Sequence, residues 1–248
     1  MKEKDERYFR IDMAGHIIAV HSHYNKVYEM CKRFYSDSVS EADIFIETTE
    51  EEILKEKLQA DEKYSSLNYD YFETLLVYRK ISEELLSFDT FLMHGAVVAL
   101  GENAFMFTAK SGTGKTTHVK KWLENKSECY IVNGDKPLIK ITDKQAIACG
   151  SPWSGKEHLY TNTMVPLKAI IIMERSEENH IENISFGDAF TFLLMQTHRP
   201  CDGIKMIKTL KLLKQLNGRV SFYRFYFNNL KDDAFDVSFK ALTHLQME

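Results

Sequence analysis

The hydrophobic and polar positions of residues 1–90 have the periodicity of a small α/β layer. Thr49 and Glu52 form a capping-box pattern ahead of a charged segment, which predicts a helix start. The predicted features are strand-like stretches within 7–20 broken at Gly15, a short apolar run at 42–47, a helix from about Ile53 and a helix over 71–86.

The pattern changes from Phe91 onward, where turn residues concentrate: all 4 prolines and 10 of the 11 glycines lie between Gly95 and Gly218. The predicted elements are strands at 92–100, 104–108, 130–132, 138–141, 167–173 and 220–227, and helices over 114–124, 186–196, 203–216 and 233–245. A Gly101-Glu102-Asn103 turn joins the first two strands as a hairpin. Hairpins beside a strand–loop–helix unit predict an α/β fold with a mixed sheet.

Composition supports one core of ordinary size with a smaller appended layer. The chain has 248 residues, 44% hydrophobic and 27% charged, which excludes disordered and fibrous classes. We therefore expect two domains, a small N-terminal α/β layer at 1–90 and a core at 91–248. The longest apolar runs are too short to span a bilayer, and the charged first ten residues do not resemble a secretory leader.

The cysteine pattern and the charge distribution indicate the cellular compartment and the class of ligand. Four scattered cysteines without a CxxC pair predict neither a disulfide framework nor a structural zinc site, and they favour the cytoplasm. Residues 1–90 carry 12 basic and 20 acidic side chains, a net of −8, whereas residues 91–248 carry 20 and 16, a net of +4. This excess is too small for nucleic-acid binding, but it suits a small polyanion. No membrane partner is expected, and the oligomeric state stays open, a homo-oligomer included.

The most informative segment is Phe105-Met-Phe-Thr-Ala-Lys-Ser-Gly-Thr-Gly-Lys-Thr-Thr117. It fits the strand–GxxxxGK[ST]–helix pattern with Ala109 in the first glycine position. A glycine-rich turn that matches by chance is the alternative. The predicted strand and helix on either side of the loop favour the phosphate-binding interpretation.

The chemistry of such a loop requires these residue types. Gly112 and Gly114 allow consecutive backbone N–H groups to face phosphate oxygens, and the helix that follows adds its positive N-terminal end. Lys115 would reach the β- and γ-phosphates, while the Thr116 hydroxyl would complete the shell of a magnesium ion.

Two further segments are candidates for the same site. Asp135 follows the strand at 130–132, where a carboxylate could hold magnesium or accept a proton; the alternative is that Asn-Gly-Asp-Lys-Pro is only a turn. In the loop 150–158, Lys156 could bind phosphate or an acidic substrate and Trp153 could wall the pocket, although an exposed turn explains this loop equally well.

Three other features have structural explanations by default. His94, expected inside the strand at 92–100, would be a satisfied core histidine. Arg175 follows a strand in a charged loop and would be solvated. The aromatic stripe over 222–227 predicts sheet core and not a base-stacking surface.

Together these motifs resemble the HPr kinase and phosphoenolpyruvate carboxykinase superfamily over residues 90–230. Ser111-Gly-Thr-Gly-Lys-Thr-Thr117 is similar to the carboxykinase P-loop. The order Met93-His-Gly-Ala-Val-Val98, hairpin, P-loop, helix and Val132-Asn-Gly-Asp135 is similar to the HPr kinase core. Within that superfamily the chain most resembles the small bacterial HPr-kinase-like serine kinases. Some of these accompany lasso-peptide tailoring, and others act on free serine.

The resemblance implies a mixed sheet bearing a P-loop and flanked by helices, and a Mg²⁺-dependent transfer from ATP to a serine hydroxyl of a peptide, protein or free amino acid. The implied roles are catalysis by Asp135, His94 and Lys115, metal binding by Thr116 and Asp135, substrate binding by Lys156 and Trp153, and nucleotide binding by Ser111, Gly112, Thr113, Gly114, Lys115, Thr116 and Thr117.

One departure leaves a second hypothesis open. HPr kinases have two adjacent aspartates after the P-loop helix, and Gly134 occupies the first position here. The alternative to a kinase is therefore a catalytically idle nucleotide-binding module that acts as a sensor or scaffold. The glycine- and arginine-rich signature of true HPr kinases is also absent, so HPr itself is not the expected acceptor. The sequence names neither the acceptor nor a strict ATP requirement.

Overall fold

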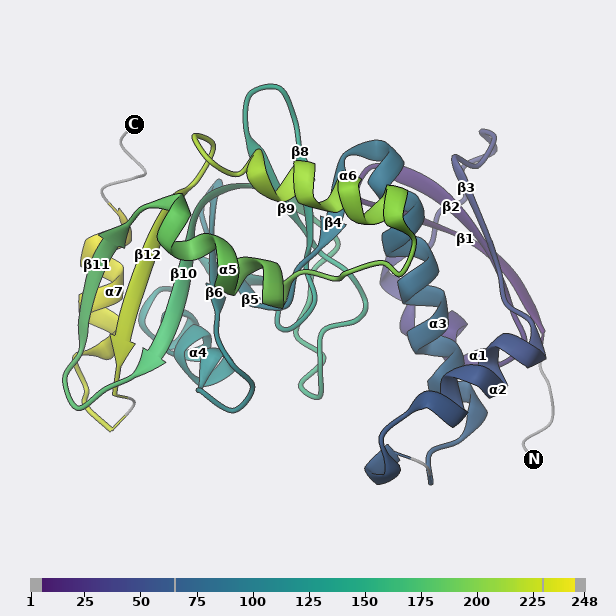
Figure 1. The fold of residues 1–248 in the computed structure, drawn as a ribbon, viewed down its shortest axis with the longest axis horizontal. Helices are drawn as coiled ribbons and strands as arrows, with labels where there is room; N and C mark the ends of the chain where they lie inside the picture. Colours follow the sequence, from purple (N-terminus) through teal and green to yellow (C-terminus); the bar gives the residue numbers. More distant parts are fainter. Residues whose placement is uncertain (1–5, 65, 229, 244–248) are drawn as a thin grey trace. The chain divides into compact units, whose positions relative to one another are not determined.

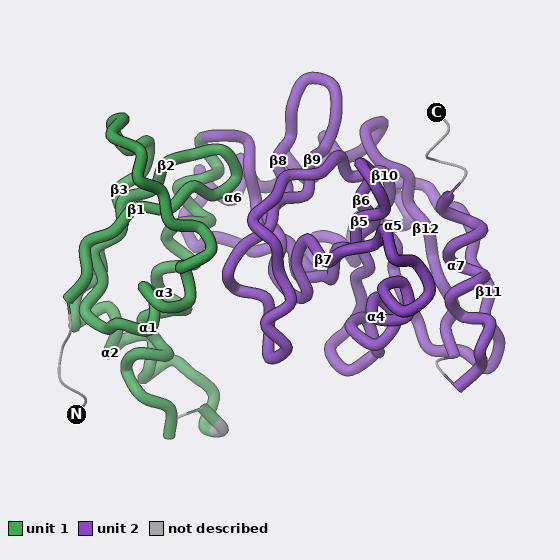
Figure 2. Tube along the Cα trace, turned by 180° about the vertical axis from the view of Figure 1, so that it is seen from behind, with its two compact units in different colours: residues 1–87 green, residues 88–248 purple. Residues whose placement is uncertain are grey.

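In the computed structural model, which describes residues 6–64, 66–228 and 230–243, the strands form two separate sheets. The chain divides into two compact units, residues 1–87 and 88–248, coloured green and purple in Figure 2. Within the described residues, no helix combines the length and apolar character needed to cross a membrane.

Unit 1 is a three-stranded sheet with helices packed on it. Its strands and helices are β1 (Arg7–Met13), β2 (His16–Ser22), α1 (Asn25–Met30), β3 (Ile44–Glu47), α2 (Glu50–Gln59) and α3 (Tyr69–Glu84). β1 pairs with β2 antiparallel, and β2 pairs with β3 parallel. The predicted capping box of Thr49 and Glu52 is confirmed, and it starts α2 at Glu50.

Unit 2 contains a large mixed sheet. Its strands are β4 (Thr90–Leu92), β5 (Ala96–Leu100), β6 (Asn103–Thr108), β7 (Cys129–Asn133), β8 (Leu138–Ile141), β9 (Ala146–Cys149), β10 (Met164–Arg175), β11 (His180–Ile184) and β12 (Ser221–Phe227). The strand order is β4-β8-β9-β10-β6-β5-β7, and β10 also pairs parallel with β12, which pairs antiparallel with β11. The mixed sheet expected from the hairpin and the strand–loop–helix unit is confirmed.

The helices of unit 2 cover this sheet (Figure 1). They are α4 (Lys115–Asn125), α5 (Phe186–Gln196), α6 (Gly203–Lys214) and α7 (Ala234–Thr243). α4 contacts β5, β6, β7 and α7. Its inner face buries Trp122 against Phe105 and Phe107, and the predicted aromatic core of β12 joins this cluster.

His118 anchors α4 inside that aromatic cluster. Its Nε2 lies 3.0 Å from the Ser238 hydroxyl, and the Trp122 indole N–H donates to the same two groups. Burial lowers the pKa of His118 to about 3, so the imidazole is neutral. The start of α4 is thus held by a packed and hydrogen-bonded core.

Several predicted elements are confirmed, and several details differ, among them the short helix α1, which was not predicted. The expected helix over 186–196 and strand at 138–141 match α5 and β8, whereas the last predicted helix extends beyond the described residues. The single strand expected at 92–100 is wrong: β4 ends at Leu92 and β5 begins at Ala96, because the backbone between them pairs with two other segments. The short strand β9 and the exposed edge strand β11 were not predicted, since neither has a strong apolar alternation.

Gly150, which follows β9, provides a test of how the loop after it is held against β7. A Cβ atom at Gly150 would overlap the Thr161 carbonyl oxygen and lie 3.1 Å from the Val132 carbonyl oxygen. We expect Gly150→Ala to cost about 3 kcal/mol or more of unfolding free energy, the upper range for overpacking. Gly203→Ala is the matched control, because nothing lies within 4 Å of its added Cβ. It should be neutral or slightly stabilising in urea denaturation; equal losses in both variants would contradict the steric account.

Candidate active site

Strand order brings three distant segments to one edge of the large sheet. β5 lies between β6 and β7 and pairs antiparallel with both. The ends of β6 and β7 therefore lie beside the beginning of β5, with Ala96 opposite Phe107 and Val97 opposite Asn133. The loop after β6, the turn after β7 and His94 ahead of β5 meet at this edge.

The loop after β6 has the backbone geometry that a phosphate loop needs. Gly112 and Gly114 have φ values of +78° and +118°, and Gly114 is the N-cap of α4. A Cβ at Gly114 would lie 3.0 Å from the Phe227 ring, so both conformation and space favour glycine there. The first N–H groups of α4 consequently open toward the loop.

Lys115, the first residue of α4, is buried with 8% of its surface exposed. Its Nζ donates to the Ala109 carbonyl oxygen at 3.2 Å, across the base of the loop. Burial lowers the pKa of Lys115, and the negative charge of Asp135 acts in the opposite direction. An ammonium group is therefore kept partly desolvated under the glycine-rich turn.

The turn after β7 is built by Asn133 and presents Asp135. The buried Asn133 Oδ1 accepts the backbone N–H groups of Asp135 at 2.8 Å and Lys136 at 2.7 Å. Its Nδ2 donates to the Ser151 carbonyl oxygen at 2.9 Å. Asn133 therefore performs the turn chemistry, and the Asp135 carboxylate is left for other contacts.

His94 holds that carboxylate from the other side. Its Nε2 lies 3.1 Å from Asp135 Oδ1, and its Nδ1 lies 3.1 Å from the Gln196 side-chain oxygen. Backbone bonds fix the arrangement, because His94 N donates to the Gln196 carbonyl and Gly95 N donates to the Asp135 carbonyl. His94 is thus a half-buried residue between two strands, not the core strand residue that the default reading expected.

Burial by itself would raise the pKa of Asp135, but its neighbours reverse the effect. The hydrogen bond from His94 and the charges of His94, Lys136 and Lys115 together lower the pKa of this carboxyl. Asp135 is therefore ionised at neutral pH. Oδ2 accepts no hydrogen bond from the described residues, so one carboxylate oxygen stays available.

A pocket of about 240 Å³ lies beside Asp135. Its lining includes Thr116 from α4, Asp135 from the turn after β7, and Lys156 from the loop 150–158. The remaining lining residues are Gly134, Ser154, Gly155, Glu157 and Leu159. Lys120 on α4 forms an ion pair with Glu157, which ties this loop to the helix. Thr116, Asp135 and Lys156 are therefore brought together, whereas Trp153 is buried and does not line the pocket.

Close packing explains the glycine before Asp135. A Cβ at Gly134 would lie 3.2 Å from the Ser154 carbonyl oxygen and 3.3 Å from the Leu159 carbonyl oxygen. Gly134 N also donates to the Leu159 carbonyl. An aspartate at this position would require these neighbouring carbonyl groups to move by a few tenths of an ångström.

The other predicted nucleotide-binding residues lie outside the pocket lining. Ser111 and Thr117 are exposed, and the Thr113 hydroxyl donates to the Lys110 carbonyl at 2.8 Å. Two polar side chains at the site were not predicted. Arg175 is exposed, as expected, but its Nη2 also donates to the Gly112 carbonyl oxygen at 2.7 Å. Gln196, the partner of His94, had no signal in the sequence, since 102 residues separate the two.

The pocket offers oxygen ligands of the kind that Mg²⁺ prefers. The Thr116 hydroxyl and the Asp135 carboxylate line the same space. The ionised state of Asp135 suits a hard divalent cation, and one or two carboxylates with several waters are its usual protein ligands. These two residues fit the ion that the P-loop pattern implies.

Comparison with known proteins gives little beyond this geometry. No protein-family model matches the chain, and no curated protein matches it. Among solved structures, it is similar to the Hpr(Ser) kinase/phosphatase from Coxiella burnetii, with 10% identity over 63% of this chain and 92% of that chain, and a TM-score of 0.39. A likeness of this size establishes no activity.

The buried ammonium of Lys115 generates a stability prediction. A lysine whose pKa is lowered by folding binds fewer protons in the folded state, so its cost is fully present at neutral pH and shrinks as pH rises toward 10.5. Lys115→Met should therefore be as stable as the wild type at pH 7 or about 1 kcal/mol more stable.

The advantage of Lys115→Met should decrease between pH 7 and pH 10, as measured by thermal unfolding. Lys144→Met removes an exposed lysine in the turn between β8 and β9 and should show no such pH dependence. A clear loss of stability in Lys115→Met at pH 7 would mean that this lysine is retained for structural reasons.

Proposed function

We propose that this protein is a magnesium-dependent kinase that transfers the γ-phosphoryl group of ATP to a serine hydroxyl of a peptide, a protein or free serine. The proposal is carried by one observation. A glycine-rich loop that ends in a buried lysine lies at the same sheet edge as a pocket lined by Thr116 and an ionised Asp135. A cation, a hydroxyl and a carboxylate in this order are the parts that phosphoryl transfer requires.

The loop residues would bind the nucleotide. The N–H groups from Ser111 to Thr117 would surround the β- and γ-phosphates, and the Lys115 ammonium would move from the Ala109 carbonyl to a phosphate oxygen. Arg175 holds the Gly112 carbonyl and so keeps that peptide group oriented. Mg²⁺, held by Thr116 and Asp135, would neutralise charge on the phosphate oxygens.

The electrostatics of Asp135 favour metal binding over proton transfer. A general base works best when its pKa lies near the working pH, and this carboxyl has a pKa below its ordinary value of 3.8. His94 supports the ionised form through its Nε2, and Gln196 orients His94 in turn. We assign Asp135 to the metal and His94 to its positioning.

The acceptor would bind near the loop 150–158. Lys156 is exposed at the pocket and could hold the phosphates or an acidic group of the acceptor. In the transfer, the serine oxygen bonds to the γ-phosphorus, the bond between that phosphorus and the β,γ-bridging oxygen breaks, and ADP leaves while the hydroxyl proton passes to water. A carboxylate that acts as a general base is not indispensable, because the transition state is loose.

The second candidate function is a nucleotide-binding module without turnover. The observation that favours it is Gly134, which leaves a single carboxylate after β7. The two functions share the phosphate loop and differ in whether any hydroxyl acceptor accelerates ADP release.

The first prediction of the kinase proposal concerns Lys115. Wild-type protein with ATP and Mg²⁺ should release ADP faster when serine or serine-containing peptides are added. Lys115→Met should lower this rate by about 10²–10³-fold, because the charge that stabilises the transferred group is lost. Lys144→Met is the charge-matched control and should retain the wild-type rate. Tight nucleotide binding without stimulation by any hydroxyl acceptor would favour the idle module.

The second prediction concerns Asp135. Asp135→Asn keeps the shape of the side chain but removes its charge, and turnover should fall by at least about 10²-fold. A metal ligand should also show a higher Mg²⁺ requirement and partial rescue by excess Mg²⁺ or by Mn²⁺. Asp143→Asn, in the exposed turn after β8, should change neither quantity. Intact turnover in Asp135→Asn would show that the Asp135 charge has no part in the reaction.

A further inference from the structure

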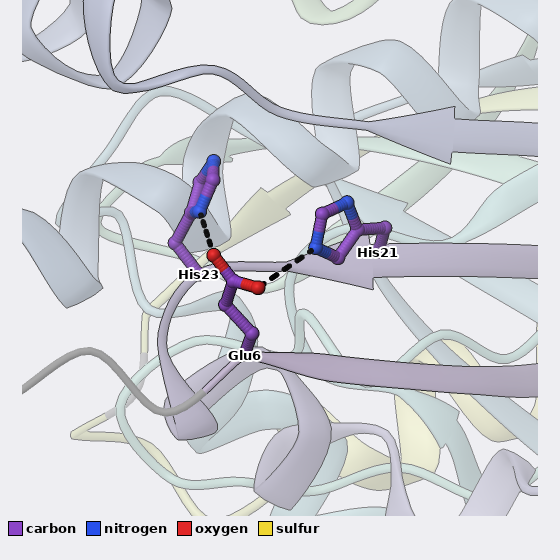
Figure 3. Close-up of side chains that lie close together, drawn as sticks. All are labelled: Glu6, His21 and His23. Carbon is purple, nitrogen blue, oxygen red and sulfur yellow. Dashed lines mark ion pairs between the residues drawn. The ribbon is translucent and has the colours of Figure 1, made fainter.

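Three side chains of types that can bind a metal ion lie close together at one edge of the unit 1 sheet. Glu6 precedes β1, His21 lies in β2 and His23 follows β2. The antiparallel pairing of Arg7 with Ser22 places Glu6 beside both histidines. In Figure 3 the Glu6 carboxylate lies between the two imidazole rings, and the ligand atoms of all three lie within 4.8 Å of one another.

Each imidazole already uses one nitrogen in a way that leaves the other free for a ligand. His21 Nδ1 lies 3.1 Å from the Glu47 carboxylate, and His23 Nε2 lies 2.7 Å from the Thr48 carbonyl oxygen. Because both partners are acceptors, these nitrogens carry the protons. The remaining nitrogens, His21 Nε2 and His23 Nδ1, are buried and make no hydrogen bond with the described residues.

This pattern is that of metal-ligating histidines, which usually donate their other N–H to a carboxylate or a backbone carbonyl. Such a bond fixes the tautomer and directs the lone pair of the second nitrogen at the metal. Here His21 has the carboxylate partner and His23 the carbonyl partner.

The scaffold around the cluster is fixed by a buried carboxylate. Glu73 on α3 accepts the backbone N–H groups of His23 at 2.6 Å and Tyr24 at 2.9 Å. It also accepts the Thr48 hydroxyl at 2.8 Å. The ring of Tyr8 stacks on His21 with centroids 4.0 Å apart. Both ligand-bearing positions are therefore set before any ion binds.

The Glu6 carboxylate lies within ion-pair distance of both imidazoles but forms no hydrogen bond with either. Glu6 Oε2 lies 3.9 Å from His21 Nε2, and Glu6 Oε1 lies 3.6 Å from His23 Nδ1. Both exceed ordinary hydrogen-bond lengths. Ligands at roughly 2.1 Å from a tetrahedral ion lie roughly 3.4 Å apart, so a small movement of the exposed Glu6 side chain would complete the geometry.

We propose that Glu6, His21 and His23 bind a divalent transition-metal ion, with Zn²⁺ as the best match and water in the fourth position. Two imidazoles and one carboxylate are a ligand set typical of zinc sites with an open position. The ion would join the segment ahead of β1 to the end of β2. The sequence analysis predicted no structural zinc site because the cysteines are not paired. Cysteine spacing cannot detect a site made of histidine and glutamate.

The test is metal binding by the full chain, prepared without a histidine tag and stripped with a chelator. Titration calorimetry with Zn²⁺ should give one site per chain, and Co²⁺ should give visible absorption bands of a four-coordinate ion. Glu6→Gln, His21→Gln and His23→Gln should each weaken Zn²⁺ binding by at least about 100-fold. Glu47→Gln should weaken it by about 10–100-fold, the usual effect of removing the carboxylate behind a ligating histidine.

His16→Gln is the matched control, because His16 begins the same strand and pairs with Asp43 instead. It should bind Zn²⁺ as the wild type does. Glu6 is exposed, so Glu6→Gln should fold normally even where a histidine variant folds poorly. Zn²⁺ should raise the Tm of the wild type but not the Tm of Glu6→Gln. Absence of binding below millimolar Zn²⁺, or binding that Glu6→Gln and His23→Gln leave unchanged, would overturn the proposal.

Discussion

The antiparallel pairing of β5 with both β6 and β7 is the constraint on which the site depends. A strand between two antiparallel neighbours places the ends of both neighbours beside its own beginning. A shift of one residue in either ladder would exchange the side chains on the two faces of these strands, and close packing on both faces opposes such a shift. All five residues of β5 are buried, so this register is strongly specified by the core. Site geometry and core packing are therefore fixed by the same contacts.

The groups gathered at this edge are costly to bury. Lys115 has a lowered pKa because its ammonium is desolvated, and the pKa of Asp135 is lowered because His94 and nearby cations outweigh the effect of its burial. The aromatic cluster around Trp122 and the neutral His118 hold α4 in place despite that cost. A phosphate with its metal would compensate both charges, since it supplies anionic oxygens to the lysine and a cation to the aspartate.

Local patterns were sufficient to predict the glycine-rich loop between β6 and α4 and the place of Asp135 after β7, because the residues that form each of them are neighbours in sequence as well as in space. The same reasoning could not find Gln196 or the role of Arg175. Gln196 is separated from His94 by 102 residues, and Arg175 is separated from Gly112 by 63 residues. Only the folded chain brings these partners together. The metal-ligating cluster of unit 1 was missed for a related reason, since His21 and His23 meet Glu6 through strand pairing alone.

The surroundings of Gly134 in the structure give a second explanation for the glycine at this position. As a sequence feature it marks a missing aspartate and suggests a lost activity. In the structure, the Ser154 and Leu159 carbonyls occupy the space that a larger side chain would need. Ser154 and Leu159 line the pocket, so a larger side chain at position 134 would press on the pocket wall. A loose transition state depends on charge neutralisation more than on a base, so under the proposed function Lys115, Thr116 and an ionised Asp135 would be the parts that contribute most to phosphoryl transfer.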